Sequence, residues 1–599
     1  MTATPRAFAT FDIGGATTAT ALIAMVGGRW RLLGSMAGPV AAPPDLLLGL
    51  LAQRVCAMAP DLTAAIGLTP AEALDLPRLL ARSLEPRTIA VLAASERALA
   101  PLVSVVARSG WRWLAASAER EHAQALTALL LNPAVSAVLV GAGDPPGGDE
   151  RGHLAEMGAI AAAAAVRRPE LTVILAGSMT NARTWFGLPP ERASRRHLPD
   201  GPRSGTADRA RSRPRVGEAP RAGGEAGAAG GPVAEGWLPE GWQAADIAGD
   251  DVTRDAPRAR VLLAPRVATG SPAWRGLTDL LVGLQREDGD SRRGIAAAAP
   301  GLAGALDRRV EVVEIGFNGG LRAGGVPGRS AGAGTGLAIA SADAALVPPD
   351  IDEARLERVQ GWSTLPFDRH RLRDRLMELR VAPWSGVAGD GARLRLMAAR
   401  AAMARLLELT PEMDDGPNPD LLVLAGGAFA PAPAAAILLA AADVIRRPSA
   451  VQVVFDHARL LGPLGTIEDP TERDRLLADL AGDLLAPLGA IVMPAGLRAG
   501  RRAGRVTVDG PAGITTIGLD AGGLDQVPLA AGRRAAVTLE SSEPFLMGGR
   551  GRRISVEVAG GVAGLLLDLR GVPLRLADRR ELRREQLTRW QDAAWPEGR

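Results

Sequence analysis

Lysine and tyrosine are absent from this sequence of 599 residues, so every basic side chain other than five histidines is an arginine. A P-loop nucleotide site needs a lysine to reach the phosphates, and a pyridoxal phosphate enzyme binds its cofactor through one. Both classes are therefore excluded. The net charge is only +3 although the pI is about 10.2, because almost no side chain titrates between about pH 8 and 12. The pI consequently says little about binding partners.

Cysteine is nearly absent as well. The single thiol, Cys56, lies in "LLAQRVCAMAP", a helical pattern in which we expect it to be part of the core. One cysteine excludes intrachain disulfides and cysteine-rich zinc sites. The histidines lack the spacing of a metal site; they are His122, His153, His197, His370 and His457.

Long apolar runs are missing too, since no stretch reaches the ~18 residues that a membrane-spanning helix needs. The N-terminal "MTATPRAFATF" lacks the basic and then apolar pattern of a secretion signal. We expect a cytoplasmic protein with no membrane partner.

Strand and helix patterns alternate through most of the chain, which predicts an α/β protein. Residues 194–256 interrupt the pattern with a segment rich in glycine, proline and arginine, which cannot bury enough apolar surface to fold. An arginine-glycine tail that binds nucleic acid is the alternative. Because acids are interspersed and aromatics are nearly absent, we expect no nucleic-acid partner. We predict a first lobe over 1–193, a disordered linker over 194–256, a second lobe over 257–498, a small β-rich module over 499–578 and a C-terminal helix over 579–599.

The segment "DIGGATT" combines the residues that a phosphate-binding hairpin needs. Gly14 and Gly15 let backbone N–H groups approach an anion without interference from a Cβ atom, and Thr17 and Thr18 can add hydroxyl donors. Asp12 would repel a phosphate, but it can hold Mg²⁺ through a water molecule. The alternative is a β-hairpin without a ligand.

Two further glycine motifs follow buried strands. In "LVLAGGAFAPAP", Gly426 and Gly427 can let the sugar and base of a nucleotide lie against bare backbone, although an ordinary strand–helix turn has the same pattern. "VLVGAGDPPGG" matches a dinucleotide fingerprint only in part, because its third glycine is one position late and Pro145 and Pro146 interrupt the turn. "DIGG" followed by "VLVGAGD", and "EIG" followed by "LVLAGGA", indicate an internal duplication.

The order of these motifs resembles that of the actin, Hsp70 and sugar-kinase superfamily. "VVFDHARLLGPLG", "LAPLGAIVMP", "GGVAGLLLDLRGVPL" and "RREQLTRW" narrow the resemblance to the MutL-type (GlmL) accessory proteins of adenosylcobalamin-dependent glutamate (methylaspartate) mutase. This resemblance implies a duplicated actin-like (ribonuclease H-like) fold of two lobes that binds ATP and Mg²⁺. It also implies a protein partner, a cobalamin-dependent mutase, which the protein would reactivate as a chaperone.

The resemblance also assigns roles to individual residues. Asp12 and Glu314 would be catalytic, and Asp12 would hold the Mg²⁺ through water. The nucleotide would contact Gly14, Gly15, Thr17, Thr18, Gly316, Gly319, Gly320, Gly426 and Gly427.

Departures from the family pattern predict slow hydrolysis. Glu314 replaces the aspartate of the second hairpin, "EIGFNGGL" lacks its Thr-Thr-Asp end, and the acidic loop keeps only Asp144. The longer side chain moves the carboxylate by roughly 1 Å, and a displacement of ~1 Å can cost on the order of 10²-fold in rate. We expect ATP binding with a weak ATPase activity. A non-catalytic scaffold that binds a partner and a small-molecule kinase are the alternatives.

Overall fold

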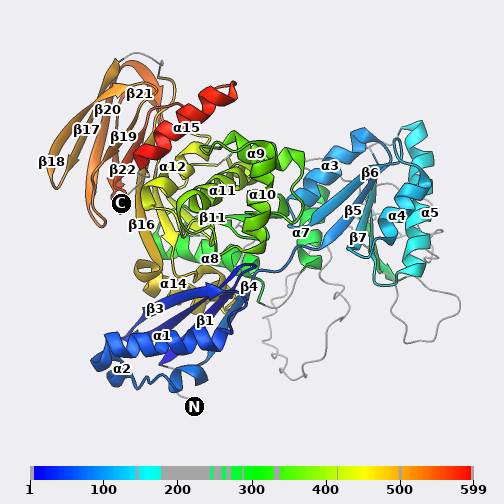
Figure 1. Ribbon diagram of the computed structural model, residues 1–599, viewed down its shortest axis with the longest axis horizontal. Helices are drawn as coiled ribbons and strands as arrows, with labels where there is room; N and C mark the ends of the chain where they lie inside the picture. The colour runs from blue at the N-terminus through cyan, green and yellow to red at the C-terminus, as the bar shows by residue number, and fades with distance from the viewer. Residues whose placement is uncertain are drawn as a thin grey trace, which may run out of the picture. The chain divides into compact units, whose positions relative to one another are not determined.

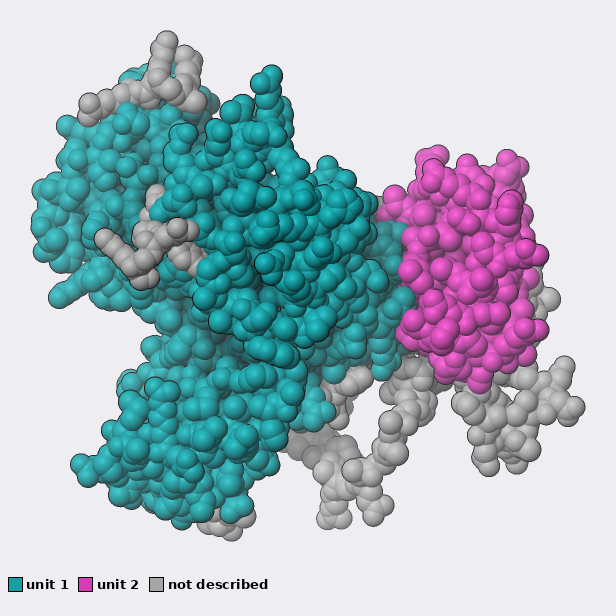
Figure 2. Space-filling view, in the orientation of Figure 1, with its two compact units in different colours: residues 1–88, 103–113, 281–599 teal, residues 89–102, 114–280 magenta. Residues whose placement is uncertain are grey.

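The computed structural model describes residues 6–142, 147–176, 243–246, 260–264, 272–285, 289–328, 338–414, 416–497 and 502–594. The chain divides into two compact units (Figure 2). The first comprises Met1–Thr88, Val103–Trp113 and Leu281–Arg599, and the second comprises Ile89–Leu102 and Leu114–Leu280. Asp144 and the predicted linker lie outside the described residues, except for 243–246, which form a short strand.

The N-terminal sheet of the first unit has the strand order β3-β2-β1-β4. Its strands are β1 (Ala7–Ile13), β2 (Thr17–Val26), β3 (Arg29–Pro39) and β4 (Arg78–Arg82). Helix α1 (Pro44–Met58) covers one face of this sheet (Figure 1), where its Leu48 and Leu51 pack against Phe11 and Leu22. Cys56 on α1 is half-buried rather than in the core, with its Sγ 3.5 Å from the Leu68 carbonyl. Helix α2 (Pro60–Ile66) follows α1.

The central sheet of the first unit has the strand order β13-β12-β11-β14-β15-β16-β22-β19. Its strands are β11 (Val310–Ile315), β12 (Gly320–Gly325), β13 (Ala338–Ser341), β14 (Leu421–Ala425), β15 (Ser449–Asp456), β16 (Leu485–Met493), β19 (Leu524–Val527) and β22 (Leu565–Asp568). Strand β14 is nearly free of polar side chains because helices cover both faces of the sheet at this point.

One layer of helices lies between the two sheets. It contains α8 (Ser291–Leu306), α13 (Leu461–Gly465) and α14 (Pro470–Leu484), whose apolar side chains share one core with both sheets. The opposite face of the central sheet is covered by α9 (Glu353–Gly361), α10 (Arg369–Val381), α11 (Gly389–Leu409) and α12 (Ala434–Val444). This arrangement brings the ends of β1 and β11 toward the same layer of helices.

The two sheets begin with the same arrangement of strands. Strand β1 is antiparallel to β2 and parallel to β4, and β11 is antiparallel to β12 and parallel to β14. The repeat expected from the sequence instead paired "VLVGAGD" with "LVLAGGA". That correspondence is not found, because the "VLVG" part of this motif ends β7 (Val135–Gly141), which belongs to a different sheet from β1.

A sheet of order β6-β5-β7-β8-β10-β9 forms the core of the second unit. Its strands are β5 (Thr88–Ala93), β6 (Arg112–Ser117), β7, β8 (Thr172–Ala176), β9 (Gln243–Asp246) and β10 (Arg260–Ala264). The helices of this region are α3 (Glu96–Ala107), α4 (Ala123–Leu131), α5 (Gly148–Arg167) and α7 (Pro272–Leu284). Strands β7, β8 and β10 are parallel neighbours, so the sheet includes residues from both sides of the predicted linker.

The C-terminal part of the chain forms a further sheet and completes the central one. Strands β17 (Arg502–Gly510), β18 (Gly513–Asp520), β20 (Arg534–Leu546) and β21 (Arg550–Ala559) make an antiparallel sheet, whereas β19 and β22 join the central sheet. Helix α15 (Arg580–Ala594) lies beside α12 (Figure 1). Among the described residues no single helix is long and apolar enough to cross a membrane, although α1 and α2, bent by 112°, pass that test as a pair.

Candidate functional site

The ends of β1, β11 and β14 line a cavity in the first unit, together with the turn after β15. The cavity therefore brings together four segments that are separated in the sequence. Of the residues predicted from the sequence, it is lined by Asp12, Gly14, Gly15, Thr17, Glu314, Gly316, Gly426 and Gly427.

Two hairpins of matching geometry form one side of the cavity. The N–H of Gly14 donates to the Thr17 carbonyl at 2.9 Å, and the N–H of Gly316 donates to the Gly319 carbonyl at 2.9 Å. The hairpins touch, because a Cβ atom on Gly15 would lie 2.6 Å from the Asn318 side chain. Each hairpin follows a strand whose penultimate residue is acidic, which places Asp12 and Glu314 at equivalent positions.

The glycine pair after β14 lines the same cavity. Gly426 has a φ of +93°, and a Cβ atom there would collide with the Ile315 carbonyl at the end of β11. A Cβ atom on Gly427 would lie 2.7 Å from Nη2 of Arg459. Only glycine fits at Gly426, both for its backbone conformation and for its space. The backbone of this turn can therefore approach a ligand closely.

Thr18 lies away from the cavity although Thr17 lines it. Successive side chains of a strand point to opposite faces, so the two neighbouring threonines of β2 cannot both reach one ligand. The Thr18 side chain is 1% exposed, and its Oγ1 has no hydrogen-bond partner among the described residues.

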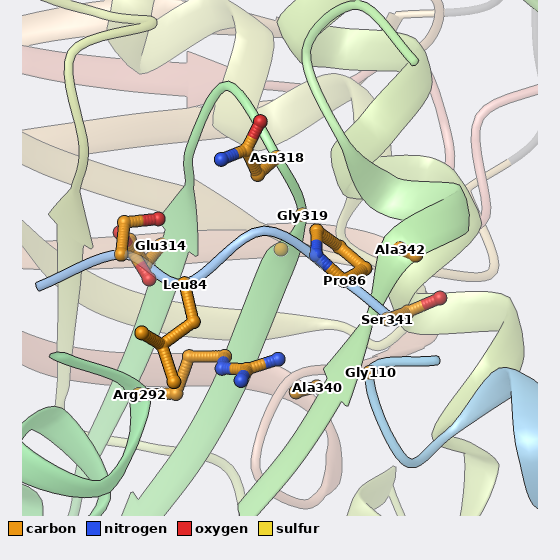
Figure 3. A pocket seen from close by; sticks show the side chains of 12 residues that line it. Leu84, Pro86, Gly110, Arg292, Glu314, Asn318, Gly319, Ala340, Ser341 and Ala342 are labelled. Carbon is orange, nitrogen blue, oxygen red and sulfur yellow. The ribbon is translucent and has the colours of Figure 1, made fainter. Parts of the chain in front are cut away.

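Gly319 and Gly320 line a second, neighbouring cavity (Figure 3). Ser83 and Glu314 line both cavities, so the Glu314 side chain lies where the two meet. Figure 3 shows Arg292 at the wall of the second cavity. The second hairpin therefore presents Gly316 to one cavity and its last two glycines to the other.

Both carboxyl groups of the site hold their protons more strongly than usual. Burial and the repulsion of Asp456 raise the pKa of Asp12 to about 6, against the favourable field of Arg459 and a hydrogen bond with Ser291. Burial and the negative charge of Asp12 raise the pKa of Glu314 to about 8. The two carboxyls are thus close enough to interact, and Glu314 is mostly protonated near neutral pH.

Two arginines at the cavity were missed in the sequence. Arg395 comes from α11, and Arg459 comes from the turn after β15, within a stretch noticed only as a family motif. Nη1 of Arg459 donates to Oγ1 of Thr17 at 2.6 Å. The turn is fixed by Asp456, whose carboxylate accepts the N–H groups of Leu460 and Leu461 at 3.0 and 3.1 Å.

The donor groups of the cavity suit a magnesium ion that keeps part of its water shell better than a metal ion bound by protein ligands alone. Within the described ranges, no three His, Cys, Asp or Glu side chains come together to hold a metal ion. Mg²⁺ usually keeps several waters and is bound through one or two carboxylates together with substrate phosphates. Asp12 and Glu314 supply such a pair beside the backbone of the hairpins.

Comparisons with known proteins add little to this geometry. No protein-family model matches the sequence, and no curated protein sequence matches it either. Among solved structures, the chain is similar to a PilM-PilN type IV pilus biogenesis complex, with 13% identity and a TM-score of 0.20. The match covers 72% of this chain and 84% of that chain. With so low a TM-score, the likeness carries no argument about fold or function.

Proposed function

We propose that the cavity between the two hairpins binds ATP with Mg²⁺, and that the first unit is a two-lobed actin-like (ribonuclease H-like) nucleotide-binding fold. The observation that carries the proposal is the pair of matching hairpins, which meet at one cavity and bring Asp12 and Glu314 together. The common strand arrangement of the two sheets supports the proposal, because a nucleotide site between two related lobes would use one hairpin from each.

Each lining segment has a distinct task in this proposal. The hairpin N–H groups and Oγ1 of Thr17 would bind phosphate oxygens, and the backbone of Gly426 and Gly427 would lie against the nucleoside. Asp12 would hold the metal ion through water, and Glu314 lines the same cavity. When bound, Mg²⁺ would supply positive charge that neutralises the phosphates and the carboxylate of Asp12.

Hydrolysis by this site would be slow. A general base must be ionised at the working pH, but the raised pKa of Glu314 keeps its carboxyl protonated near neutral pH. The second hairpin has Gly319 and Gly320 where the first has Thr17 and Thr18, so it offers no hydroxyl donors. The same two features favour the second candidate function, a scaffold that keeps the fold and binds a partner without nucleotide.

Replacing Asp12 with asparagine should weaken the binding of ATP with Mg²⁺ by about tenfold or more, which is ~1.4 kcal/mol. Asparagine keeps the size of the side chain but removes the charge that orients the hydrated metal ion. Isothermal titration in the presence of Mg²⁺ measures the effect. Asp45→Asn on α1 is the control, because Asp45 is exposed and its ion-pair partner among the described residues is Arg78 at 2.7 Å. An Asp12→Asn variant with unchanged affinity would remove Asp12 from the site.

The finer proposal is that the protein reactivates a cobalamin-dependent mutase. It rests on the sequence motifs alone, in particular "GGVAGLLLDLRGVPL" and "RREQLTRW". We expect the protein to co-purify with such a mutase, and to restore the activity of one that turnover has inactivated. A pull-down read by mass spectrometry, followed by assays on a panel of mutases from the same genome, makes the test. If none of the mutases binds or recovers activity, the mutase proposal is wrong. If the Asp12→Asn variant captures a partner protein without nucleotide, the scaffold function is supported.

A further inference from the structure

Arg395 is a buried arginine without a carboxylate partner. Its side chain is 6% exposed, and its Nε donates to the Gly386 carbonyl at 3.2 Å while Nη2 donates to the Pro383 carbonyl. No carboxylate of the described residues lies within ion-pair distance of it. Buried charges are normally paired with an opposite charge. Arg322 follows that rule, with its Nε 2.9 Å from Glu311.

Carbonyl groups alone can hold a buried guanidinium, so the environment of Arg395 does not by itself identify a ligand. Arg355 is 2% exposed and donates to the carbonyls of Asp343, Ala345 and Leu346. Arg395 differs because it lines the cavity between the hairpins and faces a second arginine there. The loop at 383–386 is held by Nε and Nη2, so the Nη1 nitrogen remains available to a ligand.

Arg459 is the second arginine, and it is held in an unusual backbone conformation. Its φ is 54°, in the left-handed region that costs a residue with a side chain about 1 kcal/mol or more. The side chain is half-buried and rests on a neutral group, Oγ1 of Thr17. In the part of the chain that the structure describes, no carboxylate lies within ion-pair distance of Arg459. The nearby Asp456 carboxylate is already occupied by two backbone N–H groups.

The two guanidinium groups repel each other across the cavity. Burial and the charge of Arg459 lower the pKa of Arg395, which is the signature of like charges in a poorly hydrated site. Asp12 and Glu314 also line the cavity, but neither lies within ion-pair distance of Arg395 or Arg459. An anion with several oxygens, lying between the two arginines, would relieve the repulsion.

We propose that Arg395 and Arg459 clamp the terminal phosphoryl group of a bound nucleoside triphosphate, and that the hydrogen bond from Arg459 to Thr17 is a resting contact that phosphate oxygens replace. The choice of a nucleotide rests on the proposed function of the cavity, whereas the choice of a phosphoryl group rests on the two arginines. The guanidinium of Arg459 can bind phosphate oxygens through two parallel hydrogen bonds, which a lysine cannot do, and Arg395 can add a hydrogen bond from its Nη1. An arginine pair therefore suits a chain that has no lysine.

The test compares ATP with ADP in the Arg459→Gly variant. Glycine adopts a φ of 54° without strain, so the variant should fold, and its unfolding temperature should be no lower than that of the wild type. Its affinity for ATP should fall by about tenfold or more, while its affinity for ADP stays within about threefold. Isothermal titration with Mg²⁺ gives both constants. Arg395→Gln should show the same loss of preference for ATP. The ATP affinity of Arg459→Lys should lie between the affinities of Arg459→Gly and the wild type.

Asp307→Gly is the matched control. Asp307 has a φ of 51° at the end of α8, so its replacement makes the same change in the backbone without touching the cavity. It should leave both affinities unchanged. If Arg459→Gly weakens the binding of ATP and of ADP equally, or weakens neither, the proposed clamp is wrong, although the nucleotide site is still supported.

If the wild-type protein binds no nucleotide, the proposed function is wrong. In that case, titrations of the wild type and Arg459→Gly with pyrophosphate and inorganic phosphate test the clamp. Binding of either anion that Arg459→Gly abolishes supports a phosphoryl site with another ligand. Absence of binding, or binding that the variant leaves intact, overturns the clamp as well.

Discussion

Replacing Asp443 with asparagine is expected to lower the free energy of unfolding by about 3–5 kcal/mol. Asp443 on α12 accepts a hydrogen bond from Nη1 of Arg570 at 2.7 Å, and it lies 2.9 Å from Nε of Arg400. All three side chains are 1% exposed. Asparagine preserves the size of the side chain but removes its charge. The guanidinium groups of Arg400 and Arg570 would then stay buried with only one carboxylate of this network. That carboxylate belongs to Asp568, which Arg570 contacts at 2.7 Å.

The effect should extend to the C-terminal helix, because Arg570 lies over the ring of Trp590 in α15, 4.4 Å from its centroid. Urea unfolding gives the loss of stability, and hydrogen exchange read by mass spectrometry should show faster exchange over α15. Glu353→Gln is the matched control. Glu353 also contacts two arginines, Arg369 and Arg373, but it is 60% exposed. That substitution should cost less than about 1 kcal/mol. A loss for Asp443→Asn as small as that of the control would contradict the prediction.

Replacing Glu314 with glutamine should make the empty protein more stable than the wild type at alkaline pH and no different at about pH 4. The pKa of Glu314 rises from 4.5 to about 8 on folding, because burial and Asp12 disfavour the charge. Below pH 4.5 the group is protonated in both states and costs nothing. As the pH rises toward 8 the unfolded chain loses this proton first, so the stability of the wild type falls. At pH 9 the penalty is on the order of 5 kcal/mol, and glutamine avoids it.

Several charged groups act on Glu314 besides Asp12. Asp290 raises its pKa further, while Arg292 and Arg459 lower it. These groups are unchanged in Glu314→Gln, so the difference from the wild type isolates the one carboxyl. Denaturant unfolding without nucleotide at pH 5, 7 and 9 measures it. Glu581→Gln, at an exposed position of α15, is the control and should follow the wild type at each pH. A difference that does not grow between pH 5 and pH 9 would show that Glu314 ionises normally.

The features that the sequence reveals are those encoded by a few neighbouring residues. Asp12 and Glu314 each stand two residues before a glycine that begins a hairpin, and the structure gives both hairpins the same closing hydrogen bond. A turn depends on local backbone freedom, so its residues can be recognised without knowing what lies opposite. The positive φ of Gly426 at the end of β14 is a further case.

The sequence did not reveal which strands are neighbours in the sheets. The parallel neighbour of β1 is β4, a short segment whose sequence "RLLAR" has a weak strand pattern, whereas the apolar β7 lies in another sheet. The neighbouring threonines pose the same difficulty. Alternation along β2 predicts that Thr17 and Thr18 face opposite sides, but only the packed sheet decides that Thr17 faces the cavity.

Helix α11 shows why the charged part of the site depended on tertiary structure. Its arginines at 395, 400 and 405 look alike in "GARLRLMAARAAMARLLEL". In the fold, Arg395 lines the cavity, Arg400 lies beside Asp443, and Arg405 contacts Asp343 at 3.2 Å. The sequence by itself determined the hairpins, the glycine turns and the excess of arginine. What each guanidinium does was decided by the group opposite it, and those groups come from distant segments that meet only when the sheets and helices have packed.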